Sequence, residues 1–237
     1  DPEMSRGLGD VYKRQYLKNS NADIICLQEY NTASNKKFVT EQDVKKALKA
    51  YPYQSIRQQR KGDVQLACFS RFPILSSQLI EYKSDYNGSM KYVLNVNNDT
   101  ITLINNHLES NKLTKEDRGI YEDMIKDPNA KKVKTGLRQL IRKLGEASAI
   151  RASQADSVAR IITENHYPTM IVCGDFNDGS ISYTHRVLTQ ELDDAFTQSG
   201  KGLGISYNQN KFYFRIDNIL ILSLIHISEP TRHLRIS

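Results

Sequence analysis

The chain has 237 residues, 39% of them hydrophobic, so it is long enough to bury one substantial core. Its formal net charge of +6 is a weak indication of polyanionic partners. No run of 18 or more apolar residues and no recognisable signal peptide occurs, so we expect no membrane-spanning helix within the chain as given.

The two ends of the chain are predicted to lie outside the fold. Residues 5–15 read SRGLGDVYKRQ and residues 222–232 read LSLIHISEPTR. One DNA duplex can encode the second segment on one strand and the first, residue for residue, on the other. Two unrelated natural tails would almost never be related in this way, and the string resembles a transposase adapter used for sequencing libraries. We therefore interpret 1–15 and 222–237 as adapter-like artefacts and 16–221 as a single domain.

Between these ends, apolar runs alternate with polar turns in a pattern typical of many strands and a few helices. The predicted strands are Asp23–Gln28, Tyr53–Gln58, Gln65–Ser70, Ile74–Tyr82, Lys91–Val96, Thr100–Asn106, Tyr167–Cys173 and Lys211–Ile221. The predicted helices are Tyr16–Asn21, Glu41–Ala50, Lys115–Lys126, Lys134–Asn165 with a break at Gly145, and His185–Leu192. These elements predict an α+β fold, namely a four-layer αββα sandwich of two packed β-sheets flanked by helices, incomplete at both ends.

Two groups of residues have an ordinary structural explanation. The cysteines Cys26, Cys68 and Cys173 sit in separate apolar runs without metal-ligand spacing, which predicts small buried side chains and no disulfide framework. The basic residues of 112–143 are interleaved with acidic ones, which favours a solvated helical face over a patch for nucleic acid or lipid headgroups. A dedicated basic nucleic-acid-binding domain would also interleave aromatic residues, and this region offers only Tyr121.

Four short polar motifs lie on predicted strands, three of them at the end of a strand and one within the last strand. They are Leu-Gln-Glu at 27–29, Asn-Asn-His-Leu at 105–108, Gly-Asp-Phe-Asn-Asp at 174–178 and Arg-Ile-Asp at 215–217. Side chains at strand ends converge on one rim of a sheet sandwich, where a polar site does not disturb the core. Each motif is weak alone, but all four in this order make a specific pattern.

This set resembles the endonuclease/exonuclease/phosphatase family of metal-dependent phosphodiesterases, over nearly all of residues 16–221. The likeness is nearest to bacterial members with a helical insertion between the His strand and the Gly-Asp-Phe-Asn strand, here 112–165. It implies hydrolysis of a phosphodiester in nucleic acid or in a phospholipid headgroup, by a monomer. Some relatives carry membrane helices ahead of the catalytic domain, so a membrane anchor in the parent protein is also an expectation.

The resemblance gives a role to each of four residues. Glu29 is the expected ligand of Mg²⁺ (or Mn²⁺), a hard cation that takes one or two protein carboxylates. Asp175 orients or helps to deprotonate the attacking water, and Asn177 donates a hydrogen bond to the phosphate. In extended geometry these two side chains would point to the same side. His107 contacts the scissile phosphate or acts as general acid, roles that suit its near-neutral pKa.

Further site residues are expected on the same basis. Asp217 matches the aspartate that holds a catalytic histidine in its working tautomer. Asn106, Arg151 and Gln154 are predicted to bind substrate, the last two because they resemble an Arg and Gln pair near the site of some relatives. An ordinary exposed helix face is the alternative for that pair. The motif residues also have structural alternatives. Glu29 could be a surface carboxylate, Asp175 and Asn177 could cap a turn, and His107 could be hydrogen-bonded by neighbouring backbone.

Two parts of the family pattern are absent from the sequence. The resemblance implies a metal-binding asparagine upstream of Tyr16, and an Asp-His pair after Ile221 that supplies the general base. Adapter-like sequence occupies both places, so we expect this polypeptide to show little or no hydrolysis. A non-catalytic domain on the same fold, binding nucleic acid or a membrane surface, is the alternative function.

Overall fold

The computed structural model describes residues 15–17, 19, 21–30, 40–58, 65–84, 87–114, 116–117, 119–120, 131–209 and 212–222. The strands are β1 (Ile24–Tyr30), β2 (Tyr53–Gln58), β3 (Gln65–Ser70), β4 (Ile74–Leu79), β5 (Gly88–Val96), β6 (Asp99–His107), β7 (Thr169–Asp175), β8 (Asp193–Asp194), β9 (Tyr207–Gln209), β10 (Phe212–Phe214) and β11 (Asp217–Leu222). The helices are α2 (Glu41–Ala47), α4 (Lys131–Thr163), α5 (Tyr183–Leu188) and α6 (Ala195–Ser199). Within these ranges, no helix is both long and apolar enough to cross a bilayer.

The strands form two main sheets and a short hairpin. The first sheet has the order β1-β3-β2, and the second has the order β4-β5-β6-β7-β11-β8. Strands β6 and β7 are parallel neighbours, whereas the other paired strands are antiparallel. A parallel pair needs a long crossover connection, and α4 lies within that connection. Strands β9 and β10 pair only with each other.

Alternation along β3 shows how the first sheet is buried on both faces. Leu66 and Cys68 belong to an apolar cluster shared with β5 and β6 of the second sheet. The intervening Ala67 and Phe69 belong to a different cluster, together with Val44 of α2. The first sheet is therefore packed between α2 and the second sheet.

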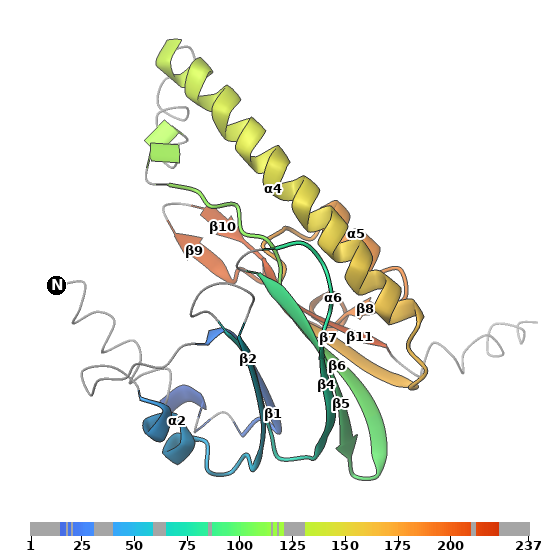
Figure 1. The fold of residues 1–237 in the computed structure, drawn as a ribbon. Helices are drawn as coiled ribbons and strands as arrows, with labels where there is room; N and C mark the ends of the chain where they lie inside the picture. Colours follow the sequence, from blue (N-terminus) through green and yellow to red (C-terminus); the bar gives the residue numbers. More distant parts are fainter. Residues whose placement is uncertain are drawn as a thin grey trace, which may run out of the picture.

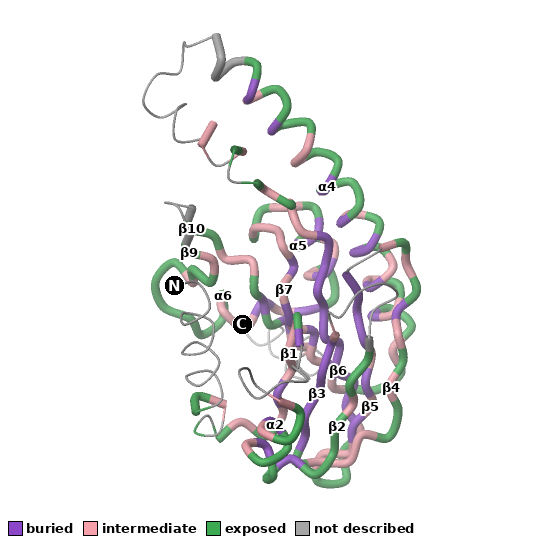
Figure 2. Tube along the Cα trace, turned by 60° about the vertical axis from the view of Figure 1, so that its left-hand side comes forward, coloured by how far each residue is buried: buried purple, intermediate pink, exposed green. Residues whose placement is uncertain are grey.

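The side chains of β7 alternate in the same way between the two faces of the second sheet. Ile171 and Cys173 face the first sheet, while Met170 and Val172 pack in a cluster with Val158 of α4 and with residues of α5. Figure 1 shows α2 at one outer side of the strands and α4 and α5 at the opposite side. Buried residues follow the central strands and one side of α4 (Figure 2). The fold is the predicted αββα sandwich of two sheets with outer helices.

Most predicted elements are present with small shifts of their ends. Strands β2 and β3 have the predicted bounds, whereas β1 runs on to Tyr30 and β5 begins at Gly88. The helix predicted over 185–192 ends at Leu188, because the chain then enters the short edge strand β8. The helix predicted over Lys115–Lys126 lies largely outside the described residues.

The break predicted in the longest helix is wrong, because α4 runs without interruption through Gly145. This glycine is exposed, while Leu140 and Ala147 on either side of it are buried. A glycine inside a helix costs about 1 kcal/mol relative to alanine. Packing of the flanking turns is sufficient to offset a penalty of that size.

The single strand predicted over Lys211–Ile221 is also wrong, since β10 and β11 belong to different sheets. Between them Arg215 donates hydrogen bonds from both terminal nitrogens to the carboxylate of Asp194. The backbone N–H of Asp217 donates to Ser206 Oγ at 3.0 Å. These side-chain bonds turn the backbone away from one continuous ladder, and hydropathy alone does not reveal them.

The cysteines are free thiols that meet between the sheets. Cys68 is fully buried, and Cys26 and Cys173 are partly buried. Cys26 and Cys68 are directly opposite each other on β1 and β3. Hydrogen bonds with the two neighbouring thiols, together with burial, raise the pKa of the Cys26 thiol well above its ordinary value. A structural role for these residues is consistent with that protonated state.

Gly174 is the point at which β6 and β7 come closest. Its φ is +124°, and a Cβ placed there would lie 2.1 Å from the backbone oxygen of Asn106. Only glycine adopts this conformation without strain and leaves room for the neighbouring strand.

We predict that Gly174→Ala lowers the free energy of unfolding by about 3 kcal/mol or more, because it combines left-handed strain with a backbone clash. Urea unfolding followed by far-UV circular dichroism measures the change. Gly145→Ala is the matched control, since nothing lies within 4 Å of its added Cβ, and it should stabilise α4 by up to about 1 kcal/mol. Equal effects of the two substitutions would contradict the prediction.

Candidate active site

The four motifs meet at one rim of the sandwich. In the strand registers Asp175 of β7 is the partner of both His107 of β6 and Asp217 of β11, so these three residues lie side by side. Glu29 approaches from the other sheet, with its Oε1 3.7 Å from His107 Nε2. The structure thus brings together four residues that the sequence separates by up to the length of the domain.

Glu29 reaches this position through an irregularity in β1. The register of β1 on β3 shifts between Leu27 and Tyr30, and Glu29 has a left-handed φ of 52°. Gln28 Nε2 donates to Asn105 Oδ1 at 2.6 Å, and Asn105 Nδ2 donates to the carbonyl of Leu27 at 3.3 Å. These bonds tie β1 to β6 beside the site. Sequence reasoning gave this pair no role, although both residues belong to the four motifs.

Asp175 and Asn177 are connected through the backbone and do not share an extended strand. Asn177 has a left-handed φ of 50°, so the expectation of extended geometry is wrong. The turn forms because the N–H of Asn177 donates to Asp175 Oδ1 at 2.7 Å. The intervening Phe176 is fully buried and anchors the turn in the core. Asn177 Nδ2 donates to the carbonyl of Leu108 at 2.9 Å, beside His107.

The charges at the rim are not balanced. Burial, with smaller contributions from the carboxylates of Asp217 and Glu29, raises the pKa of Asp175 to about 7 against the opposing hydrogen bond from Asn177 and the charge of Arg151. Burial also holds the pKa of His107 below its ordinary value of 6.5, although the nearby carboxylates act in the opposite direction. At neutral pH His107 is therefore uncharged, while Asp175 is partly protonated.

This surplus of negative charge fits a hard divalent cation. The Glu29 side chain is 73% exposed, so its carboxylate is accessible to an ion and its waters. Within the described ranges, no three His, Cys, Asp or Glu side chains lie close enough together to enclose a metal. Mg²⁺ does not require such a cage, because it binds through one or two carboxylates and keeps several waters.

Arg151 and Gln154 lie beneath the rim on the inner face of α4 and are both buried, so the alternative of an exposed helix face is wrong. Arg151 Nη1 donates to the carbonyl of Glu109 at 2.9 Å, and its Nε lies 3.3 Å from Asp178 Oδ2. Gln154 Oε1 accepts from the N–H of Glu109 at 2.8 Å. The two residues hold the segments that follow His107 and Asn177.

The remaining expected site residues lie in different surroundings. Asn106 is fully buried on the opposite side of β6 from His107, and its Oδ1 accepts from Ser89 at 2.6 Å. Asp217 lies close enough to influence the charge of His107, but His107 Nδ1 has no hydrogen-bond partner in the described part of the chain. His185 is not part of this group, because its Nε2 pairs with Asp194 Oδ2 at 2.9 Å.

Comparisons with known proteins agree with this architecture. The model of the Endonuclease/Exonuclease/phosphatase family matches residues 14–221. No curated protein matches the sequence significantly.

Several solved structures share the fold at low sequence identity. D. rerio TDP2 complexed with single strand DNA product has a TM-score of 0.60 and 17% identity, over 90% of this chain and 76% of that one. The human Nocturnin catalytic domain with bound sulfate has a TM-score of 0.57 and 15% identity, over 90% and 73%. An endonuclease/exonuclease/phosphatase from Bacteroides vulgatus has a TM-score of 0.60 and 16% identity, over 89% and 77%. At these identities the likeness shows the fold alone.

The raised pKa of Asp175 has a consequence for stability. Between the unfolded value of 3.8 and the folded value of about 7, the folded state keeps a proton that the unfolded chain releases. Stability therefore falls as pH rises through this window, by at most about 1.4 kcal/mol per pH unit.

We predict that Asp175→Asn stabilises the protein at pH 8, by about 1–4 kcal/mol, because the amide removes the buried charge and keeps the acceptor for the N–H of Asn177. The gain should shrink towards zero near pH 4. Urea unfolding in EDTA at both pH values measures it, with the exposed Asp99→Asn as control. A variant that is less stable than the parent at pH 8 would show that the charge is compensated.

Proposed function

Because the chain belongs to the endonuclease/exonuclease/phosphatase family, we propose that it is a divalent-metal-dependent phosphodiesterase with its site at Glu29, His107 and Asp175. The observation that carries the proposal is the meeting of these three residues at one rim, where burial and neighbouring carboxylates raise the pKa of Asp175. Phosphoester hydrolysis is the chemistry of the family, whereas the ion and the residue roles are our proposal.

Glu29 is the proposed ligand of Mg²⁺ or Mn²⁺, since its carboxylate is a hard oxygen donor at the exposed edge of the site. A bound cation would polarise a phosphoryl oxygen and stabilise the leaving group as it gains charge. Asp175 orients the attacking water and accepts its proton, because a carboxylate with a pKa near 7 is basic enough at neutral pH.

His107 and Asn177 are the proposed donors to the phosphate. Neutral His107 can donate from one ring nitrogen without carrying a charge of its own into the site. The amide of Asn177 has two N–H groups, of which one is bonded to the carbonyl of Leu108. The other is suited to an oxygen whose negative charge grows in the transition state.

Arg151 and Gln154 are proposed as positioning residues rather than as direct substrate ligands. Both are buried, and their hydrogen bonds reach Glu109, Asn111 and Asp178. These partners follow His107 and Asn177 in the chain. Fixing them limits the movement of the two phosphate donors. Holding catalytic groups in the correct geometry lowers the barrier of the reaction.

A nucleic acid is the proposed substrate. The net charge of +6 favours a polyanion, and a similar fold is known with a single-strand DNA product, in D. rerio TDP2. The phospholipid headgroup expected from the family resemblance is the competing phosphodiester, and the two differ in what lies beyond the scissile phosphate.

We predict that Glu29→Gln abolishes stabilisation of the protein by Mg²⁺ or Mn²⁺, because the amide lacks the anionic oxygen. For the unmodified chain, ion at 100 times its Kd should add about 2.7 kcal/mol to the free energy of unfolding. Thermal unfolding with and without the ion measures the difference. Glu41→Gln, on the exposed surface of α2, is the control and should respond like the parent.

Equal stabilisation of the parent and of Glu29→Gln would overturn the proposed metal site. This test uses binding, which does not depend on turnover. Metal-dependent hydrolysis of bis-p-nitrophenyl phosphate that Glu29→Gln removes would demonstrate turnover directly, and would refute the expectation that this polypeptide is inactive.

A further inference from the structure

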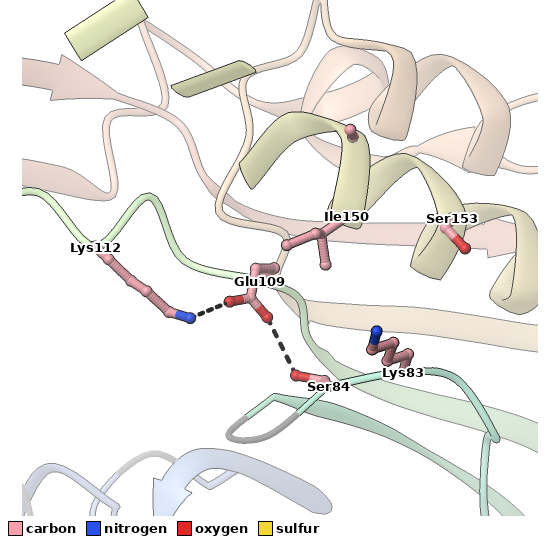
Figure 3. A pocket seen from close by; sticks show the side chains of 7 residues that line it. Lys83, Ser84, Glu109, Lys112, Ile150 and Ser153 are labelled. Atoms are coloured by element: carbon pink, nitrogen blue, oxygen red, sulfur yellow. Dashed lines mark hydrogen bonds and ion pairs between the residues drawn. The ribbon is translucent and has the colours of Figure 1, made fainter. Parts of the chain in front are cut away.

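A cavity of about 430 Å³ lies beside the candidate active site, between the β4–β5 connection, the segment after β6 and α4. It is lined by Lys83, Ser84, Glu109, Lys112, Ala149, Ile150 and Ser153. Figure 3 shows Lys112 and Lys83 on opposite sides of Glu109, with Ile150 and Ser153 of the helix above them. None of the roles proposed for the catalytic residues uses this cavity.

The cavity carries a net positive charge. The Glu109 side chain is only 6% exposed, and its carboxylate is held by Lys112 Nζ at 2.6 Å and by the hydroxyl of Ser84 at 3.1 Å. Lys83 has no acidic partner among the described residues. One carboxylate and two ammonium groups leave a single positive charge for an incoming anion.

The opposite wall of the cavity is apolar and belongs to α4. Ile150 is 42% exposed although it adjoins the cavity, and Ala149 stands beside it. A ligand that covers this wall would remove hydrophobic surface from water. The lining therefore suits a molecule with an anionic group at one end and an apolar face at the other.

The cavity and the active-site rim are connected through residues 108 and 109, of which Glu109 lines the cavity. From the rim side Asn177 donates to the carbonyl of Leu108, and from the helix side Gln154 accepts from the N–H of Glu109. Glu109 is two residues beyond His107 in the chain. Two residues span at most about 7 Å of chain, so the cavity is within reach of the part of a substrate next to a phosphate held at His107.

We propose that this cavity is a subsite for a single-stranded nucleic acid, holding the phosphate next to the scissile one. Lys83 binds that phosphate together with Lys112, and the attached sugar or base lies against Ile150. The inference rests on the proposed function and deepens it by naming the substrate class. A duplex would offer the phosphate but keep its bases stacked inside, so the apolar wall favours a single strand.

The lining argues against a choline headgroup, the chief lipid alternative. Quaternary ammonium groups are recognised by aromatic side chains, and the residues that line the cavity include none. Lys83 would also repel such a cation.

The test is binding of a fluorescein-labelled oligothymidylate to the full chain in EDTA, followed by anisotropy over a range of salt concentrations. Lys83→Ala should weaken binding several-fold and reduce the slope of log K against log salt by about 0.7, the value for one phosphate contact on a single strand. Ile150→Glu should weaken binding more, since it places a carboxylate on the apolar wall. Lys49→Ala, in the exposed turn just after α2 on the opposite outer layer, is the control and should match the parent.

Unchanged affinity and salt slope in both Lys83→Ala and Ile150→Glu would overturn the subsite. Binding of phosphatidylcholine vesicles that depends on Lys83, without such dependence for the oligonucleotide, would overturn it as well. The result is separable from the metal test: Lys83-dependent binding would stand even if Glu29→Gln responded to Mg²⁺ like the parent. In that case only the proposed hydrolytic function would fail.

Discussion

The close approach of β6 and β7 at Gly174 is the constraint on which the site depends. These are parallel neighbours, and only a residue without Cβ fits against the backbone of Asn106. The resulting register places His107 next to Asp175, and the N–H of Leu108 then donates to the carbonyl of Asp175 at 3.0 Å. Any slip of this pair would move one member to the other face of the sheet and separate the two functional groups.

The rim holds strain and charge that the surrounding contacts must offset. Glu29 and Asn177 both have left-handed backbones although neither is glycine, and Asp175 is a carboxyl group in a mostly buried position. Such conformations cost about 1–3 kcal/mol each and persist only where surrounding contacts determine them. Here those contacts are the Gln28–Asn105 pair on one side and the Asn177 to Leu108 bond on the other.

Much of the fold could be predicted from the sequence, because apolar alternation and turn residues determine where β2 and β3 begin and end. The positions of the motifs at strand ends likewise predicted that Glu29, His107 and Asp175 would converge. The sequence offered the turn at Asn177 only as an alternative, although the bond that forms it is local. It did not predict the irregularity at Glu29, which depends on side-chain bonds between distant segments. The Arg215 to Asp194 bonds, which divide β10 from β11, escaped prediction for the same reason.

Buried side chains of α4 connect the rim to the neighbouring cavity. Arg151 bonds to Glu109 and Asp178 at once, so it connects the segment after His107 with the segment after Asn177. The same stretch of backbone forms the wall of the neighbouring cavity through Glu109. Because this backbone connects His107 to the buried carboxylate of Glu109, a shift of one residue is expected to shift the other. Substrate length and the alignment of the scissile bond are therefore expected to be coupled through α4.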